Sequence, residues 1–150
     1  GTQGRGVLLA HHLATISAML RRAEELNQQA VIQEYVAEAA GRDLRVIVVG
    51  NRPVAAMERR APPGDFRANL HQGGSAEPVT LDRATAALAV AAAHAHGLAV
   101  AGVDLLLSRR GPLLLEVNSS PGLEGIEKAT GVGVAEAIVE YVEANARRRR

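Results

Sequence analysis

The sequence predicts an α+β fold in which antiparallel hairpins are packed by helices. Four apolar runs form two hairpins, each with turn residues between its strands: 44–49 with 54–60, and 99–107 with 113–117. Apolar residues recur at helical spacing in residues 12–27 and 81–96. Hairpins mixed with packing helices favour this class over a doubly wound parallel sheet. With 150 residues, the chain is long enough for one domain that buries a core.

The composition argues against several functions. The chain is 47% hydrophobic but only 2% aromatic, so it lacks the platforms on which single-stranded nucleic acids stack. Its net charge is +1, and four positive charges lie in the terminal run 147–150. We interpret this run as a solvated basic tail, with an RNA or anionic surface as the alternative, and we expect no direct nucleic-acid binding.

Other sequence features restrict the chemistry and the compartment. The chain has no cysteine, which excludes disulfides, zinc–thiolate sites and thiol nucleophiles. No apolar run approaches the ~18 residues of a membrane span. The start of the chain does not resemble a signal peptide. A cytoplasmic location is therefore the default expectation.

The N-terminal part is predicted to contain a glycine-rich loop, a strand, a helix and a second strand. The opening GTQGRG precedes the apolar run 7–10, which is typical of a loop that enters a strand. Residues 12–27 predict an amphipathic helix. Residues 31–36 (VIQEYV) are rich in strand-forming side chains and predict a further strand.

The remaining segments are predicted to be connections and helices. Residues 61–78 are rich in Pro, Gly and polar residues, and so long a connection is more often functional than idle. The Ala-rich helix 81–96 is predicted to stop at Gly97. A loop at 119–131 precedes a last amphipathic helix that runs through Tyr141.

The second hairpin carries the most informative polar residues. If its turn centres on Arg110 and Gly111, Asp104 lies opposite, or nearly opposite, Glu116. Asn118 lies two residues beyond Glu116, so its side chain points to the same face. Their apolar neighbours are expected to point to the other face, into a core: Val103, Leu105, Leu115 and Val117.

Two interpretations of this polar face remain open from spacing alone. Facing carboxylates repel, and no basic residue of the local pattern neutralises Asp104 and Glu116. A hard cation such as Mg²⁺ or Mn²⁺ would resolve the conflict, because it takes oxygen ligands from Asp, Glu and Asn. An ordinary exposed face of an antiparallel sheet explains the same residues equally well.

Two other segments are candidates for phosphate binding. The backbone amides of Gly1, Gly4 and Gly6 could form an anion-binding nest, although flexible termini look the same and the spacing is not that of a P-loop. In the 61–78 connection, the guanidinium of Arg67 lies near paired glycines and could hold a phosphate.

Several other basic residues have less specific interpretations. Arg59 and Arg60 alternate on a strand, so one could point into the site and the other to solvent. His71 is interpreted as a hydrogen-bonding loop residue.

At this level the chain closely resembles the RimK-type family of ATP-grasp ligases. Three segments carry the resemblance: Gln33-Glu34-Tyr35, DFRANLHQGGSA, and AGVDLLLSRRGPLLLEVNSSPGLEGIEKATG. It extends over essentially the whole chain except the arginine tail. The family adds glutamate to the C-terminus of a small-subunit ribosomal protein, so the resemblance implies a ligase that uses ATP, glutamate and a protein C-terminus.

The resemblance also implies roles for individual residues. Asp104, Glu116 and Asn118 match the divalent-metal ligands, for Mg²⁺ or Mn²⁺. Glu34 and Tyr35 match the linker that lines the adenine.

Other matches concern the ribose and the phosphates. Asp43 matches the acid near the ribose. Arg67, Ala68 and Asn69 match a nucleotide-binding segment near the reacting phosphate, where Arg67 would stabilise the transferring group. The loop that holds Gly1, Gly4 and Gly6 resembles the loop that closes over the triphosphate.

The implied organisation is a partial ATP-grasp domain at 1–146, followed by the basic tail at 147–150. Residues 1–30 would be a remnant of the glycine-loop subdomain, and residues 31–146 the C-terminal ATP and metal subdomain. Relatives carry a further domain and a lysine-bearing strand upstream, so the chain alone is expected to lack part of the ATP site. Gln72 departs from the arginine of many relatives.

Three functions therefore remain open: the glutamate ligase itself, a sibling ligase with another acceptor, and a non-catalytic nucleotide-binding fragment. Relatives associate, so a homo-oligomer is also open.

Overall fold

The computed structural model describes residues 6–68 and 73–147. The chain forms two compact units, Gly1–Ala37 and Glu38–Arg150, each with its own internal contacts. Among the described residues, no helix is both long enough and apolar enough to span a membrane.

The first unit contains one helix, α1 (Leu13–Glu25), which confirms the predicted helix at 12–27. It begins after His12, whose backbone is extended. It ends before Asn27, which has a φ of 52°. Asparagine adopts this left-handed conformation more readily than most residues, so the helix stops there. No residue of α1 is buried.

The two strands predicted in the first unit are wrong. Residues 7–10 and 31–36 have no regular secondary structure. Their side chains suit a strand, but a strand also needs a hydrogen-bonded neighbour. All strands found in the described residues lie in the second unit. Composition alone could not supply that information.

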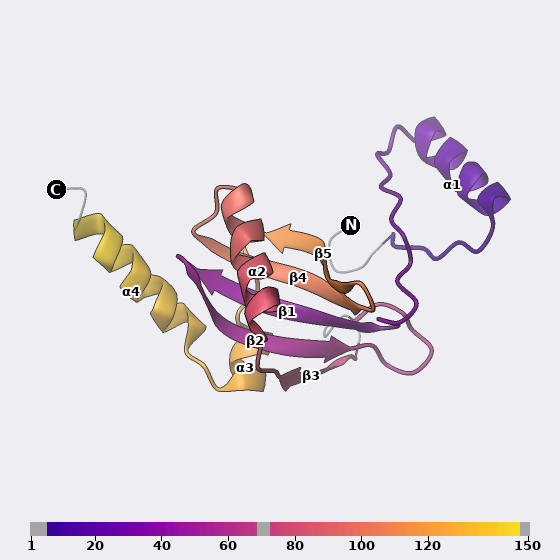
Figure 1. Ribbon diagram of the computed structural model, residues 1–150. Coiled ribbons are helices and arrows are strands. Elements are labelled where there is room, and N and C mark those ends of the chain that lie inside the picture. Colours follow the sequence, from indigo (N-terminus) through magenta and orange to yellow (C-terminus); the bar gives the residue numbers. More distant parts are fainter. Residues whose placement is uncertain (1–5, 69–72, 148–150) are drawn as a thin grey trace. The chain divides into compact units, whose positions relative to one another are not determined.

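The second unit is built on a five-stranded sheet in the order β3-β2-β1-β4-β5, in which every neighbouring pair is antiparallel (Figure 1). The strands are β1 (Arg42–Val49), β2 (Arg52–Arg60), β3 (Ser75–Pro78), β4 (Val100–Ser108) and β5 (Gly111–Asn118). Both predicted hairpins are confirmed, as β1–β2 and β4–β5. The α+β prediction is also confirmed.

One face of the sheet is covered by α2 (Arg83–Ala95), which crosses the strands in Figure 1. The helix begins after Asp82, whose carboxylate accepts a hydrogen bond from the backbone N–H of Thr85. It ends before Gly97, as predicted. The buried residues of this core come from α2 and the three central strands: Leu44, Val46, Val48, Ala56, Ala89, Ala92, Ala93, Ala101, Val103 and Leu105.

The opposite face carries a second core under α3 (Glu124–Thr130) and α4 (Val134–Arg147). Its buried residues are Ile47, Val49, Ala55, Met57, Ile126 and Val134. Tyr141 lies in α4, as predicted for the last helix. Its side chain packs on this core, and its ring lies over Gly50.

Two short elements were not predicted. Strand β3 lies at the end of the 61–78 connection and pairs with β2. Helix α3 lies within the expected loop 119–131 and buries Ile126 completely. Four and seven residues are too few for a visible period, so only the packing against a neighbouring element identifies them.

The face under α3 and α4 changes character along β1. Ile47 and Val49 enter the apolar core, whereas Asp43 and Arg45, on the same face, are charged. A charged region therefore lies beside an apolar core on a single rigid sheet.

Candidate metal and nucleotide site

Polar side chains from four strands meet on this face of the sheet. We call this group the charged cluster, and its members are Asp43, Arg45, Arg59, Asp104, Glu116 and Asn118. Asp43 and Arg45 of β1 are two positions apart, as are Glu116 and Asn118 of β5. Because side chains alternate between the faces of a strand, each pair lies on one face. All four contributing strands are held in the sheet by apolar residues of the opposite face.

The cluster residues are cross-strand neighbours. Arg45 of β1 pairs with Asp104 of β4, which in turn pairs with Glu116 of β5. Asp43 of β1 pairs with Arg59 of β2. Directly opposite residues have Cβ atoms about 4.5–5.5 Å apart, so their side chains are within contact distance.

The turn of the β4–β5 hairpin lies close to its predicted place. Ser108 pairs with Gly111, so Arg109 and Arg110 form the turn, one position earlier than expected. From this turn the strands pair regularly as far as Leu105.

A β-bulge then brings the acidic residues together. Uninterrupted pairing from the turn would place Asp104 opposite Leu115. A register shift between Asp104 and Leu105 pairs Asp104 with Glu116 instead, and Asn118 with Gly102. The predicted pairing of Asp104 with Glu116 is therefore confirmed, and the bulge is its local cause.

Two arginines bind the aspartates of the cluster. Arg45 donates to both carboxylate oxygens of Asp104, from Nε to Oδ1 and from Nη2 to Oδ2, the latter over 2.6 Å. Arg59 donates to both oxygens of Asp43, over 2.7 and 2.8 Å, and its Nη2 also donates to Oδ2 of Asp104 over 2.9 Å.

This arrangement corrects one inference from the sequence. The local pattern of the hairpin contains no basic residue that would neutralise the acids, but the structure brings Arg45 and Arg59 to Asp104 from other strands. Arg45 is 59 positions from Asp104 in the chain, so only the order of strands in the sheet could reveal the contact. The expectation that one of Arg59 and Arg60 points into the site is confirmed for Arg59.

The ion pairs of the cluster are largely shielded from water, which affects the pKa values of their members. The side chains of Asp43 and Asp104 are 9% and 4% exposed, and that of Arg59 is 13% exposed. Loss of hydration raises the pKa of the Asp43 carboxyl, against the opposing effect of the hydrogen bonds from Arg59. For Arg59, burial opposes the charge, but its hydrogen bonds to Asp43 and the charge of Asp104 outweigh it and raise the pKa.

Glu116 and Asn118 differ from the aspartates. Glu116 is exposed, and no ion pair to it is found among the described residues. Asn118 has a buried amide nitrogen with no hydrogen-bond partner in the described part of the chain. A buried polar atom without a partner is costly and rare in folded proteins.

The absence of a side chain at Gly102 leaves room for Pro121 beside the charged cluster. A Cβ atom at Gly102 would lie 2.7 Å from Cβ of Pro121 and 3.5 Å from Cδ of Arg45. Gly102 thus lets the loop after β5 pack closely against β4, whereas the distance to Arg45 is that of an ordinary contact.

The residues fit a divalent cation. Asp104, Glu116 and Asn118 provide the hard oxygen ligands that Mg²⁺ and Mn²⁺ prefer. Rotation of the Asn118 amide by 180° would place its oxygen where the unpartnered nitrogen lies, and a cation would then satisfy it. Within residues 6–68 and 73–147, no group of three or more His, Cys, Asp or Glu side chains is placed to hold a metal, in this cluster or elsewhere. The candidate site therefore rests on two acids and an amide.

Arg67 and Ala68, predicted to lie near the reacting phosphate, are in the loop after β2 and are not members of the charged cluster. Arg67 pairs with Asp65, and its guanidinium lies 5.7 Å from the centre of the Phe66 ring. The pair with Arg67 lowers the pKa of Asp65 to about 2. Ala68 follows in the same loop. For Asp43, both carboxylate oxygens already accept from Arg59, so a ribose hydroxyl would have to share them.

The remaining predicted nucleotide residues fall into two groups. Glu34, Tyr35 and Gly6 belong to the first unit, and Gly6 has a φ of 77°. The other residues lie outside the described part of the chain: Gly1, Gly4, Asn69, His71 and Gln72.

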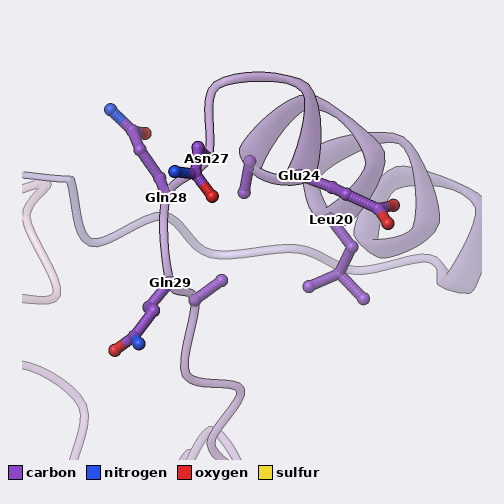
Figure 2. Close-up of a pocket in the computed structure, with 7 residues that line it drawn as sticks. Leu20, Glu24, Asn27, Gln28 and Gln29 are labelled. Atoms are coloured by element: carbon purple, nitrogen blue, oxygen red, sulfur yellow. The ribbon is translucent and has the colours of Figure 1, made fainter.

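The first unit has a pocket of about 280 Å³ at the end of α1. Figure 2 shows that side chains of the helix end and of the following segment line it, including Leu20, Glu24, Asn27, Gln28 and Gln29. None of its lining residues is a predicted site residue, so the pocket does not coincide with the charged cluster.

Sequence comparison identifies relatives of the chain. Residues 1–142 match the RimK-like ATP-grasp domain. The chain is 57% identical over 143 residues to the probable alpha-L-glutamate ligase 2 of Shewanella amazonensis, covering 95% of this chain and 48% of that protein. It is 54% identical over 147 residues to the probable alpha-L-glutamate ligase of Thioalkalivibrio sulfidiphilus, covering 98% and 49%. The chain spans about half the length of the curated relatives it matches.

Solved structures share the fold at low sequence identity. A D-alanine–D-alanine ligase from Bacillus anthracis has a TM-score of 0.69 and 21% identity, over 96% of this chain and 52% of that one. The ATP-grasp ligase PsnB, complexed with minimal precursor, Mg and ADP, has a TM-score of 0.56 and 18% identity, over 89% and 50%. These similarities concern the fold alone.

Proposed function

Because the chain belongs to the RimK-like ATP-grasp family, we propose that it forms the metal- and nucleotide-binding part of an ATP-dependent carboxylate–amine ligase. The donor would be L-glutamate, and the acceptor the C-terminus of a small-subunit ribosomal protein, which would place the reaction in the cytoplasm. The observation that carries the proposal is the bulged hairpin, which pairs Asp104 with Glu116 and puts Asn118 on the same face.

The chain's own residues would divide the work as follows. Asp104, Glu116 and Asn118 would hold a divalent cation, which neutralises phosphate charge when bound. Arg45 and Arg59 keep the Asp104 carboxylate oriented through three hydrogen bonds. No side chain would be needed as a nucleophile. The acceptor carboxylate would attack the γ-phosphorus of ATP and release ADP, and the glutamate amine would then attack the carbonyl of the acylphosphate and release phosphate.

Further residues would take the nucleotide roles that the family resemblance implies for them. Backbone groups at Glu34 and Tyr35 would line the adenine. Arg67 would leave or share its contact with Asp65 to stabilise the transferring phosphoryl group. The glycine loop that includes Gly6 would cover the triphosphate.

Calorimetry of ATP binding with and without Mg²⁺ tests the binding part of this proposal. We expect Mg²⁺-dependent binding by the wild-type chain and a loss of the Mg²⁺ dependence in Glu116→Gln, whose exposed side chain makes it safe for folding. Glu58→Gln is the matched control, because Glu58 is an acid of β2 paired with Arg60. Equal binding by wild type and Glu116→Gln would argue against the site.

Turnover assays test the ligase part. A protein that joins this chain to the upstream half of one of its relatives should form a new peptide bond between glutamate and a ribosomal-protein tail peptide when ATP is present. Peptide-bond formation only with another acceptor would identify a sibling ligase. Mg²⁺-dependent nucleotide binding without turnover on any carboxylate acceptor would indicate a non-catalytic module.

A further inference from the structure

We infer that Arg45 and Arg59 set the charge of the cation site so that it binds a divalent cation together with a phosphate anion and binds the free cation weakly. This inference rests on the proposed function, since it concerns the same three ligands. Arg45 would position the ligand Asp104 and make the site select a cation that carries phosphate. Two observations support this role: the hydrogen-bond positions already used on Asp104, and the charge balance of the cluster.

The first argument is the number of positions left on Asp104. A carboxylate has about four lone-pair positions, two on each oxygen. Oδ2 of Asp104 accepts from both Arg45 and Arg59, and Oδ1 accepts from Arg45. One position remains, on Oδ1. With both arginines in place, Asp104 is therefore restricted to a single bond to a cation.

The second argument is the charge that a cation would meet. The guanidiniums of Arg45 and Arg59 compensate the carboxylates of Asp43 and Asp104. Within the charged cluster, only the negative charge of Glu116 is left. A bare divalent cation would give the cluster a net positive charge beside two partly buried arginines, which is unfavourable where the dielectric constant is reduced.

A phosphate removes this conflict. A cation that arrives with a polyphosphate brings its own negative charge, and the same arginines then face an anion rather than an uncompensated cation. Mg²⁺ commonly binds in this way, through one or two carboxylates together with substrate phosphates. The arginine pairs of the cluster would make this preference a property of the protein.

Manganese binding, followed by electron paramagnetic resonance, tests the inference on the 150-residue chain. The wild type should bind Mn²⁺ alone at least about tenfold more weakly than it binds Mn²⁺ with ADP. Arg45→Gln keeps a hydrogen-bond donor but removes the charge, so it should bind Mn²⁺ alone about tenfold or more tightly than the wild type does. Arg45→Lys keeps the charge and should behave like the wild type.

Arg60→Gln is the matched control. Arg60 is adjacent to Arg59 in β2 but on the other face, where it pairs with Glu58 and Glu77. It carries the same charge change and should leave both Mn²⁺ affinities unchanged.

The outcomes separate this inference from the proposed function. Binding of Mn²⁺ with ADP that depends on Glu116, combined with unchanged free-Mn²⁺ affinity in Arg45→Gln, would overturn the inference alone. Wild-type binding of free Mn²⁺ as tight as that with ADP would also overturn it, and this measurement needs no variant. No binding of Mn²⁺ by the wild type under either condition would overturn the proposed site itself.

Discussion

Arg59 donates hydrogen bonds to two buried aspartates, and its loss should be felt throughout the second unit. Arg59→Ala leaves Asp43 buried without its partner, which typically costs about 3–5 kcal/mol of unfolding free energy. Urea unfolding followed by circular dichroism would measure the loss. Arg60→Ala removes the two ion pairs of a half-exposed arginine and should change stability by less than about 1 kcal/mol. Equal effects of the two substitutions would contradict the assigned network.

Gly102 allows the loop after β5 to pack closely on β4. In Gly102→Ala, the new Cβ would approach Pro121 to 2.7 Å, so either the loop or the strand must move. Overpacking of this kind usually costs about 1–3 kcal/mol, measurable by thermal or urea unfolding. Gly122→Ala is the control, because a Cβ there meets no atom within 4 Å. A Gly102→Ala protein as stable as the control would show that the contact relaxes freely.

The Asp65–Arg67 pair predicts a local pH dependence. The pKa of Asp65 is lowered from 3.8 to about 2, chiefly by the side-chain hydrogen bonds from Arg67. The stabilising effect of a depressed carboxyl is present above pH 3.8 and is lost as the pH falls towards 2. In Arg67→Gln, carboxyl chemical shifts should report an Asp65 pKa closer to 3.8, with the pKa of Asp82 unchanged as an internal control.

The sequence could reveal the acids of the site but not their partners. Asp104, Glu116 and Asn118 belong to one hairpin, so their spacing in the chain indicates their common face. Arg45 reaches Asp104 only because β1 lies between β2 and β4 in the sheet. Strand order depends on packing of the whole unit, and no local pattern contains it.

At the scale of elements, α2 depends on a single polar cap. Asp82 accepts from the backbone N–H of Thr85 over 2.8 Å and from its hydroxyl over 3.1 Å. Asp82→Ala leaves these donors of the first turn without the carboxylate, at a cost of about 0.5–2 kcal/mol. Asp82→Asn keeps an acceptor and should lose less in a denaturant titration. If the alanine and asparagine variants lose the same amount, charge rather than capping is responsible.

Prediction of elements succeeded where two neighbouring segments supported each other. The hairpins β1–β2 and β4–β5 are local in sequence, with short turns, and both were predicted. A strand at 31–36 was predicted from side-chain type alone, and this segment pairs with no strand in the part of the chain that the structure describes. Strand β3 was missed for the opposite reason, since its pairing with β2 defines it more than its four residues do.

At the scale of the whole molecule, the two units differ in how far they bury their residues. Helix α1 has no buried residue, and a 13-residue helix is marginal in water on its own. Val46, Ile47 and Val48 of β1 are completely buried. Hydrogen exchange should therefore be much faster for amides of α1 than for those of β1 and β4. Comparable protection in the two units of the isolated chain would contradict this expectation.

The bulge in the β4–β5 hairpin determines which changes of chain length the site can accommodate. Deleting the single residue Leu115 would remove the extra position and let the ladder run on without a shift. Glu116 would remain a neighbour of Asp104, because the gap closes on that position.

An insertion beyond the bulge has the opposite effect. One added residue between Glu116 and Asn118 would reverse the direction of the Asn118 side chain, towards the core under α2. A two-residue insertion would return the Asn118 side chain to the cluster face but move it about 7 Å further along the strand from Glu116. Length variants in this stretch should therefore lose the Asn118 ligand in either case. The spacing of two residues between Glu116 and Asn118 is thus what lets both side chains reach one cation.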